Sequence, residues 1–337
     1  MADYKNIKGF NIQYLDSDPP NPIEGQMWFN STTQTLKGAE AGGIPLGTWS
    51  SGGNLNTARE RVMNFDTGTQ TATLATGGSI PGTYLANTEI YNGSSWTEVN
   101  DLNTARNRGY GTGSSTAAFV GLGGAAPGYL TNTETWNGTS WTEVNEANTA
   151  RGQGGSFGST TQGIAASGNI SSSPPLRNAV NVESWDGTNW TEVAEMNTAR
   201  NDMGGFGDSY NSGVIATGLD NPTNTVVSNV EIWNGTSWTE VTEVNTGRQA
   251  PGGFGSTSDG IIAGGRNPSG PTLYAQTEIW NGSSWTELND LATARFTLQG
   301  GGTTKSGIVF SGATATQVAN TEEWTVPEYV VKTFTTS

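Results

Sequence analysis

The sequence contains neither histidine nor cysteine among its 337 residues. Their absence excludes Ser-His-Asp and Cys-His catalysis, disulfides, and the zinc, blue-copper, haem and iron–sulfur sites built on those ligands. Carboxylates, tyrosine, lysine, arginine and oxygen ligands for calcium remain available. No pattern among them stands out as a metal or cofactor site, so we expect no cofactor and no metal.

Charged residues are also scarce, at 13% of the chain, about half the usual share. The 30 acidic and 15 basic residues give a net charge of −15, which repels phosphate backbones and anionic lipids. No apolar run approaches the roughly 18 residues of a transmembrane helix, and the N-terminus lacks the apolar core of a secretory signal. We therefore expect neither a nucleic-acid partner nor membrane insertion.

Glycine and tryptophan are abundant, with 48 and 12 copies, and aromatic residues make up 9% of the chain. A disordered chain is poor in aromatic residues and rich in charge, so this composition indicates a folded protein. Glycine, threonine, serine, asparagine and tryptophan are plentiful and helix-forming residues are few. This balance favours an all-β fold with many tight turns.

The tetrad Asn-Thr-Ala-Arg, or a close variant, occurs six times at intervals of 45–49 residues, and a tryptophan lies seven residues before each tetrad. The tetrad arginines are Arg59, Arg106, Arg151, Arg200, Arg248 and Arg295, and the tryptophans are Trp49, Trp96, Trp141, Trp190, Trp238 and Trp285. Recurrence in register favours structural roles, with tryptophans packed between repeats and arginines held by a glutamate or by loop carbonyls. Sugar stacking by the tryptophans and carboxylate binding by the arginines are the functional alternatives.

Each full repeat reads as four strands, which we name a to d. Strand a is glycine-rich, strand b is apolar and ends in glycine, strand c carries Glu-x-aromatic, and strand d carries Trp-Thr-Glu-Val. An Asn-Gly hairpin signal separates strands c and d in most repeats. Four strands at this period predict a β-propeller with one blade per repeat. Over residues 48–327 the pattern resembles the kelch-type propeller, with an apolar strand, Gly-Gly, and then an aromatic residue and a tryptophan at fixed offsets.

The ends of the repeat region suggest how the ring closes. The last repeat has strands a, b and c but no following strand d, and a surplus strand d surrounds Trp49 near the N-terminus. We therefore predict a six-bladed propeller closed by residues 47–51, which leaves few exposed edges. The tail at 330–334 is an alternative partner for that position, or an added outer strand.

The repeats differ mainly between strands b and c. The spacing from the strand-c glutamate to the next tetrad arginine is constant at 17 residues, whereas the b–c loop varies in length. Variable loops on a rigid scaffold are typical of recognition surfaces, although neutral surface variation explains them equally well. The candidate binding residues on these loops are Tyr84, Tyr129, Arg177, Asp220, Arg266 and Tyr274.

Residues 1–46 lie outside the repeats and read as an extended lead-in followed by a hairpin. A Pro-rich start at Asp18, then Glu-Gly-Gln-Met-Trp-Phe-Asn from Glu24, a Ser/Thr turn, Leu36-Lys37 and a later Gly-x-Trp resemble a module of tailed-phage virion proteins. The insertion at 39–46 departs from that pattern. The chain thus divides into a docking segment at 1–46 and a propeller at 47–337.

Together the two resemblances point to structural proteins of marine bacteriophages, including cyanophages. They imply a non-enzymatic virion component (a tail or neck fibre, an adhesin or a capsid decoration) that is made in the host cytoplasm. Its partners would be other virion proteins, bound through the N-terminal segment, and a host-surface glycan or protein; assembly as a homo-oligomer is left open. The alternatives are a propeller glycosidase and a generic kelch protein-binding scaffold. The candidate carboxylates for a glycosidase are Asp66, Asp202, Asp208 and Asp259.

Overall fold

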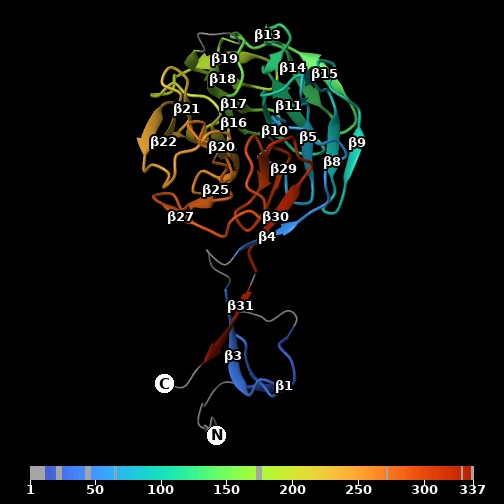
Figure 1. The fold of residues 1–337 in the computed structure, drawn as a ribbon, viewed down its shortest axis with the longest axis vertical. Coiled ribbons are helices and arrows are strands. Elements are labelled where there is room, and N and C mark those ends of the chain that lie inside the picture. Colours follow the sequence, from blue (N-terminus) through green and yellow to red (C-terminus); the bar gives the residue numbers. More distant parts are fainter. Residues whose placement is uncertain are drawn as a thin grey trace. The chain divides into compact units, whose positions relative to one another are not determined.

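The computed structural model describes residues 12–19, 25–41, 47–63, 65, 67–171, 177–270, 272–327 and 329–334. The chain divides into two compact units, one from Met1–Gly47 with Val326–Ser337 and the other from Thr48–Thr325. All regular elements of the described residues are β-strands, which confirms the all-β prediction (Figure 1). No helix in this part of the chain is long and apolar enough to cross a membrane.

Four consecutive repeats of the larger unit each form a four-stranded antiparallel sheet in chain order. The second repeat contains β10 (Tyr110–Gly113), β11 (Ala118–Gly121), β14 (Thr133–Trp136) and β15 (Trp141–Val144), and the third contains β16 (Gly155–Gly158), β17 (Gly163–Asn169), β18 (Asn178–Trp185) and β19 (Trp190–Val193). The fourth contains β20 (Gly204–Ser209), β21 (Ser212–Asp220), β22 (Thr225–Trp233) and β23 (Trp238–Val241), and the fifth contains β24 (Gly252–Ser256), β25 (Asp259–Ala263), β26 (Thr277–Trp280) and β27 (Trp285–Glu287). Figure 1 shows the sheets around a common centre, with β10, β16 and β20 near the middle.

The last repeat takes its fourth strand from the start of the unit. Its sheet consists of β28 (Gln299–Gly302), β29 (Ser306–Phe310), β30 (Thr321–Thr325) and β4 (Thr48–Ser51). β4 runs antiparallel to β30 with Trp49 opposite Trp324. The Trp49 indole donates a hydrogen bond to Thr277 Oγ1 of the preceding sheet at 3.1 Å, so this tryptophan also contacts the neighbouring repeat.

The described residues of the first repeat form three strands, β5 (Thr73–Thr76), β8 (Thr88–Tyr91) and β9 (Trp96–Val99), and the predicted strand a falls partly on residues outside the described part of the chain. The Met63 amide still donates to the Thr76 carbonyl at 3.1 Å. Just beyond it, the Gly68 amide donates to the Phe65 carbonyl at 3.0 Å. Short hairpins occupy the b–c loops of the first two repeats: β6 (Ser79–Ile80) with β7 (Thr83–Tyr84), and β12 (Gly124–Ala125) with β13 (Gly128–Tyr129).

Aromatic residues pack between neighbouring sheets. Phe157 from β16 and Trp238 from β23 belong to one buried cluster, with their ring centroids 6.1 Å apart. Glycine allows the close approach of the sheets: a Cβ on Gly260 would lie 2.1 Å from the Phe206 ring of the preceding sheet. The tryptophans therefore contribute buried contact area between repeats, at about 25 cal/mol per Å² of apolar surface.

The smaller unit is a separate four-stranded sheet in the order β1-β2-β3-β31. Its strands are β1 (Gln13–Leu15), β2 (Met27–Asn30), β3 (Thr35–Ala41) and β31 (Tyr329–Phe334). β2 and β3 form the hairpin predicted from the sequence. The sequence-based boundary differs at the C-terminal end, because β31 pairs with β3 and residues from Val326 onward belong to the smaller unit.

Asp18 organises the smaller unit. Its carboxylate accepts hydrogen bonds from the Trp28 indole at 3.0 Å and the Asn30 amide at 2.8 Å, and it pairs with Lys37 at 2.6 Å. The hydrogen bond from Lys37 is the largest of the effects that lower the pKa of Asp18 to about 2. Trp28 is fully buried beneath these contacts. Asp18 is thus bonded to three side chains of the β2–β3 hairpin.

Candidate functional site

The tetrad arginines form a buried layer in which each pairs with the glutamate of the next strand c. All six arginines are fully buried. The pairs are Arg59–Glu89, Arg106–Glu134, Arg151–Glu183, Arg200–Glu231, Arg248–Glu278 and Arg295–Glu322. We call these pairs the tetrad layer. Burial and pairing of all six arginines favour the structural interpretation over carboxylate binding.

The second repeat shows why the whole tetrad recurs. Glu134 accepts hydrogen bonds from Arg106 at 2.7 Å, from the backbone and side-chain amides of Asn103 at 2.7 and 2.9 Å, and from the Thr104 amide at 3.2 Å. The Asn103 side chain also donates to the Trp141 carbonyl at 3.2 Å. Burial lowers the pKa of Arg106, and the charge of Glu134 opposes that shift. A buried ion pair is tolerated when its remaining hydrogen-bonding capacity is satisfied in this way.

Two residues after each tetrad arginine, the chain reaches the centre of the larger unit. The residues at this position are Arg61, Arg108, Gln153, Asp202, Ala250 and Thr297, and all have positive φ angles. Each of the last five donates its backbone N–H to the carbonyl of the one before it at 2.6–3.0 Å, and Arg61 donates to Thr297 at 3.3 Å. We call these six residues the inner ring. The backbone is the same at each position, whereas the side chains differ in charge.

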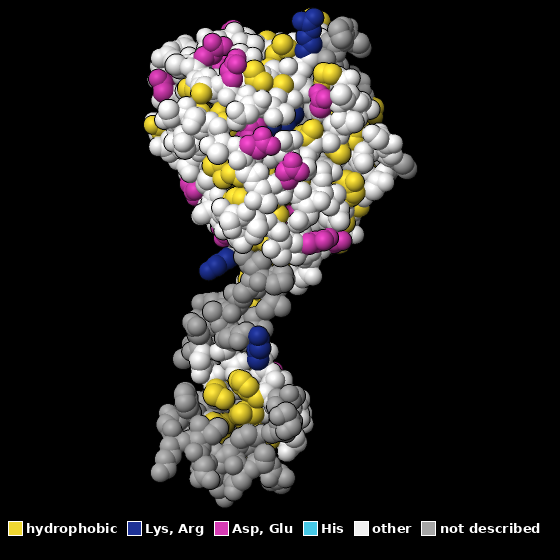
Figure 2. Space-filling model, turned by 90° about the vertical axis from the view of Figure 1, so that its left-hand side faces the viewer, with side chains coloured by type: hydrophobic (Ala, Val, Ile, Leu, Met, Phe, Trp, Pro, Cys, Tyr) yellow, Lys and Arg dark blue, Asp and Glu magenta, His cyan; other side chains and the backbone are white. Residues whose placement is uncertain are grey.

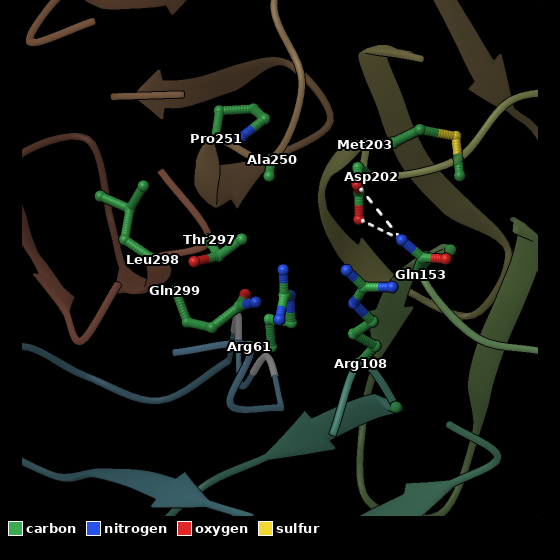
Figure 3. A pocket seen from close by; sticks show the side chains of 12 residues that line it. Arg61, Arg108, Gln153, Asp202, Met203, Ala250, Pro251, Thr297, Leu298 and Gln299 are labelled. Carbon is green, nitrogen blue, oxygen red and sulfur yellow. Dashed lines mark hydrogen bonds between the residues drawn. The ribbon is translucent and has the colours of Figure 1, made fainter. Parts of the chain in front are cut away.

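Arg61 and Arg108 of the inner ring point into a small central cavity of about 50 Å³ (Figure 3). Next to Arg108 in the inner ring, the Gln153 amide donates to Asp202, with Nε2 to Oδ distances of 3.2 and 3.3 Å (Figure 3). The side chain of Gln249 also donates to Asp202, at 2.9 Å. The acidic member of the ring is therefore held by neutral amides, and the two arginines remain turned toward the cavity.

A larger groove of about 330 Å³ adjoins the two arginines. Arg61, Arg108, Tyr84 and Tyr129 line it, and the tyrosines come from the b–c hairpins of the first two repeats. The Tyr129 hydroxyl donates to Gln153 Oε1 at 2.9 Å. Burial raises the pKa of Tyr129, and the charge of Arg108 opposes that shift. The groove thus combines two cationic groups with two aromatic rings.

Arg266 adds a third positive charge near this groove. Its guanidinium lies 4.1 Å from the centroid of the Phe296 ring. Burial lowers the pKa of Arg266, while the charges of Asp202 and Glu60 oppose the shift and that of Arg108 adds to it. Burial also lowers the pKa of Arg61, and the nearby charge of Arg108 adds to that effect. Arg61, Arg108 and Arg266 therefore lie close enough to repel one another.

The remaining predicted binding residues do not line these two cavities. Arg177 is exposed beside the b–c loop of the third repeat. Asp220 ends β21 and accepts a hydrogen bond from the Thr223 hydroxyl at 2.6 Å. Tyr274 lies 5.7 Å from the guanidinium of Arg248 and therefore contacts the tetrad layer. Of the six predicted residues, the structure brings together Tyr84 and Tyr129, with Arg266 nearby.

The described glycosidase candidates are divided between two cavities. Asp202 lies in the inner ring, whereas Asp208 and Asp259 line a different cavity of about 560 Å³ built from a–b turns. Asp208 accepts a hydrogen bond from the Thr257 amide at 3.0 Å, and Asp259 accepts one from the Thr304 hydroxyl. Asp66 lies outside the described residues. Within the part of the chain that the structure describes, no group of three or more acidic side chains could hold a metal ion.

Sequence reasoning missed Arg61 and Arg108, which are the centre of the candidate site. The predicted binding residues lie in loops of variable length, whereas these two arginines lie at a constant spacing from the tetrad. The available signal was a position with constant spacing and changing charge: arginine, arginine, glutamine, aspartate, alanine and threonine in successive repeats. Such a position indicates that the backbone is conserved between repeats and the side chain is free to specialise.

Comparison with known proteins identifies the fold and nothing further. No protein-family model matches the chain, and no curated protein sequence matches it. Among solved structures, that of YjhT, a kelch-type β-propeller, resembles this chain with a TM-score of 0.66 and 12% identity, covering 83% of this chain and 99% of YjhT. The larger unit is therefore a β-propeller.

Proposed function

We propose that the propeller has six blades and is closed by β4. Three observations support closure. The first is that β4 pairs with β30. The second is that the Trp49 indole donates a hydrogen bond to the preceding sheet, as the indoles of Trp141 and Trp190 do in their repeats. The third is that backbone hydrogen bonds link each inner-ring residue to the next and link Arg61 to Thr297. Closure by the first strand of the unit joins the two ends of the repeat region within one sheet. A rigid disc of this kind is a suitable scaffold for a binding surface.

We further propose that the protein is a non-enzymatic structural protein of a phage virion. The observation that carries this proposal is the separate smaller unit, which contains the segment that resembles a tailed-phage virion module and is completed by the C-terminal strand. This unit would attach the chain to other virion proteins. The propeller would then present its b–c loops to a host-surface glycan or protein, or to neighbouring subunits.

The surface of the smaller unit supports an attachment role. Tyr14 is 76% exposed and Phe334 is 49% exposed, and Figure 2 shows apolar side chains gathered on one face of this unit. Exposed apolar groups of this size on a small sheet favour contact with another protein. The propeller face in the same view is mostly uncharged, with scattered acidic side chains.

The hydrogen bonds of the candidate carboxylates favour a structural role over glycoside hydrolysis. Asp202 is held by two glutamine amides, and Asp208 and Asp259 are bonded to neighbouring turns. A glycosidase needs two carboxyl groups facing one scissile bond. Hydrolysis of a glycan by the full chain, lost on Asp259→Asn, would contradict the non-enzymatic proposal.

The attachment role is tested with a shortened chain of residues 48–325, which lacks the smaller unit and keeps β4. We expect it to fold, because β4 still completes the last sheet, and to be absent from particles assembled in an infected host. Particle incorporation is measured against the full chain by immunoblotting of purified virions. Normal incorporation of the shortened chain would refute the attachment role.

A chain of residues 52–325 is the matched control, because it differs only by the four residues of β4. Without β4 the last sheet loses its outer strand and Trp49, so we expect a clearly lower melting temperature than for 48–325. Equal melting temperatures for the two chains would contradict closure by β4 and would leave the attachment role untouched.

A further inference from the structure

The basic residues of the propeller outside the tetrad layer are concentrated at one end. Apart from the six tetrad arginines, residues 48–325 contain five basic residues: Arg61, Arg108, Arg177, Arg266 and Lys305. The four arginines lie in or next to b–c loops and the inner ring, and Lys305 lies in an a–b turn, at the other end of its blade. Clustering of cations on a chain with a net charge of −15 requires a reason, because dispersed charges would repel one another less.

Two of these arginines lack an acidic partner. Arg61 pairs with Glu60 at 2.8 Å. Among the described residues neither Arg108 nor Arg266 forms an ion pair, and the Nε atoms of Arg61, Arg108 and Arg266 are buried without a hydrogen-bond partner. Some tetrad arginines also have an unpartnered nitrogen, but each of those has a glutamate. Unpartnered nitrogens thus occur in both groups, and what sets Arg108 and Arg266 apart among the described residues is the lack of a paired carboxylate.

The groove has the size and lining of a small-ligand site. Its volume of about 330 Å³ lies at the lower end of the range of roughly 300–1,000 Å³ for ligand pockets. Tyr84 is 40% exposed and Tyr129 is held in place by its hydrogen bond to Gln153. Two aromatic side chains beside a pair of guanidinium groups fit a ring-bearing ligand with one acidic group.

We propose that Arg61, Arg108, Tyr84 and Tyr129 form a binding site for a small ligand that carries a carboxylate, of the kind found in acidic sugars. The Arg108 guanidinium binds the carboxylate through paired N–H donors, and Arg61 and Arg266 add to the positive potential. The three arginines near the groove face two acidic residues, Glu60 and Asp202. The local net charge is therefore +1. That balance suits a singly charged carboxylate better than a doubly charged phosphate.

This inference deepens the proposed function, on which it rests for the natural source of the ligand, a host-surface glycan. The two can fail separately. A chain that binds no acidic sugar but still needs its smaller unit for incorporation would refute only the ligand site. A chain that binds an acidic sugar and is incorporated without its smaller unit would refute only the attachment role.

The test is calorimetric titration of the full chain with D-glucuronate, with D-glucose as its neutral analogue and with inorganic phosphate. We expect glucuronate to bind at least tenfold more tightly than either of the other two. Glucuronate binding no tighter than glucose binding, or binding of phosphate alone, would overturn the assignment of a carboxylate site.

Arg108→Gln is the decisive variant, because Gln153 occupies the equivalent position in the next repeat with a similar positive φ. We expect it to weaken glucuronate binding at least tenfold, as for loss of a charged hydrogen-bonding group. Arg177→Gln, on the same face but away from the groove, is the matched control and should change binding less than twofold. Equal weakening by both variants would mean that general charge, and not this groove, attracts the ligand.

Discussion

The tetrad layer and the inner ring lie two residues apart along the chain and use arginine in different ways. Arg106 is fully buried and its charge is matched by Glu134, whereas Arg108 faces a groove without an acidic partner among the described residues. The tetrad-layer position carries arginine in all six repeats. The inner-ring position carries arginine in two repeats and glutamine, aspartate, alanine or threonine in the others. Repetition thus marks the residues that hold the fold, and variation within the same backbone marks those available for binding.

The strongest test of this comparison is the same substitution at both positions. Arg106→Gln leaves the Glu134 carboxylate buried without a cation, so we expect a loss of about 3–5 kcal/mol in the free energy of unfolding. Arg108→Gln removes no ion pair and should change stability by less than about 1 kcal/mol. Urea denaturation of the two variants measures both values. Similar losses of unfolding free energy in both variants would show that the tetrad-layer and inner-ring arginines contribute equally to stability.

A smaller change in stability is expected at the one tetrad that does not begin with asparagine. The sixth tetrad begins with Ala292, whose backbone amide donates to Glu322 at 2.6 Å but whose side chain cannot reproduce the bonds made by Asn103. In Ala292→Asn the new amide would donate to Glu322 and, if β4 completes the blade, to the Trp49 carbonyl. We expect about 0.5–1.5 kcal/mol of added stability, measured as a higher melting temperature.

Ala292→Leu is the control for that substitution, because it adds volume without an amide and should not stabilise the protein. An equal gain from both variants would show that packing, and not the hydrogen bonds, accounts for the effect. A gain from asparagine that disappears in Ala292→Asn combined with removal of residues 1–51 would attribute part of it to β4.

The smallest expected effect concerns the smaller unit, whose ion pair is partly exposed, unlike those of the tetrad layer. The pKa of Asp18 is lowered in the folded state to about 2 from its ordinary value of 3.8. The ionised carboxylate therefore stabilises this sheet above pH 4, and the contribution is lost as the pH falls from about 4 to about 2. Solvent screens this pair, so the loss should stay below about 1 kcal/mol.

Hydrogen exchange of the β2 and β3 amides, measured between pH 5 and pH 2, reports the stability that the smaller unit loses when Asp18 becomes protonated. Asp18→Asn should remove the part of the pH dependence that comes from this carboxylate, whereas the amides of β14 and β18 in the propeller should keep their protection in both proteins. Unchanged pH dependence in Asp18→Asn would show that another group controls the unit.

Much of the fold could be predicted from repetition alone, because each buried ion pair needs an arginine and a glutamate at a similar spacing. The tetrad arginines, the interface tryptophans and the hairpin at β2–β3 all came from such local patterns. The pairing of β31 with β3 did not, because it joins residues from opposite ends of the chain and neither strand carries a signal for the other.

The candidate site was predictable only in part. Tyr84 and Tyr129 were selected because their loops vary, but Arg177 and Asp220 met the same criterion and lie away from the groove. Loop variation identifies a face of the propeller, and it does not say which residues of that face meet. The spacing of Arg61 and Arg108 from the tetrad was visible in the sequence, whereas their convergence depends on two blades being side by side.

The amino-acid pattern alone indicated most of the strands, the repeat and the residues that carry buried charge, because apolar runs, turn chemistry and tetrad spacing are local properties of a chain. Only the tertiary structure decided that Arg61, Arg108 and Arg266 share one end of the propeller with two tyrosines, and that both ends of the chain build one small sheet. Those contacts depend on how whole sheets pack against one another, which no short stretch of sequence encodes.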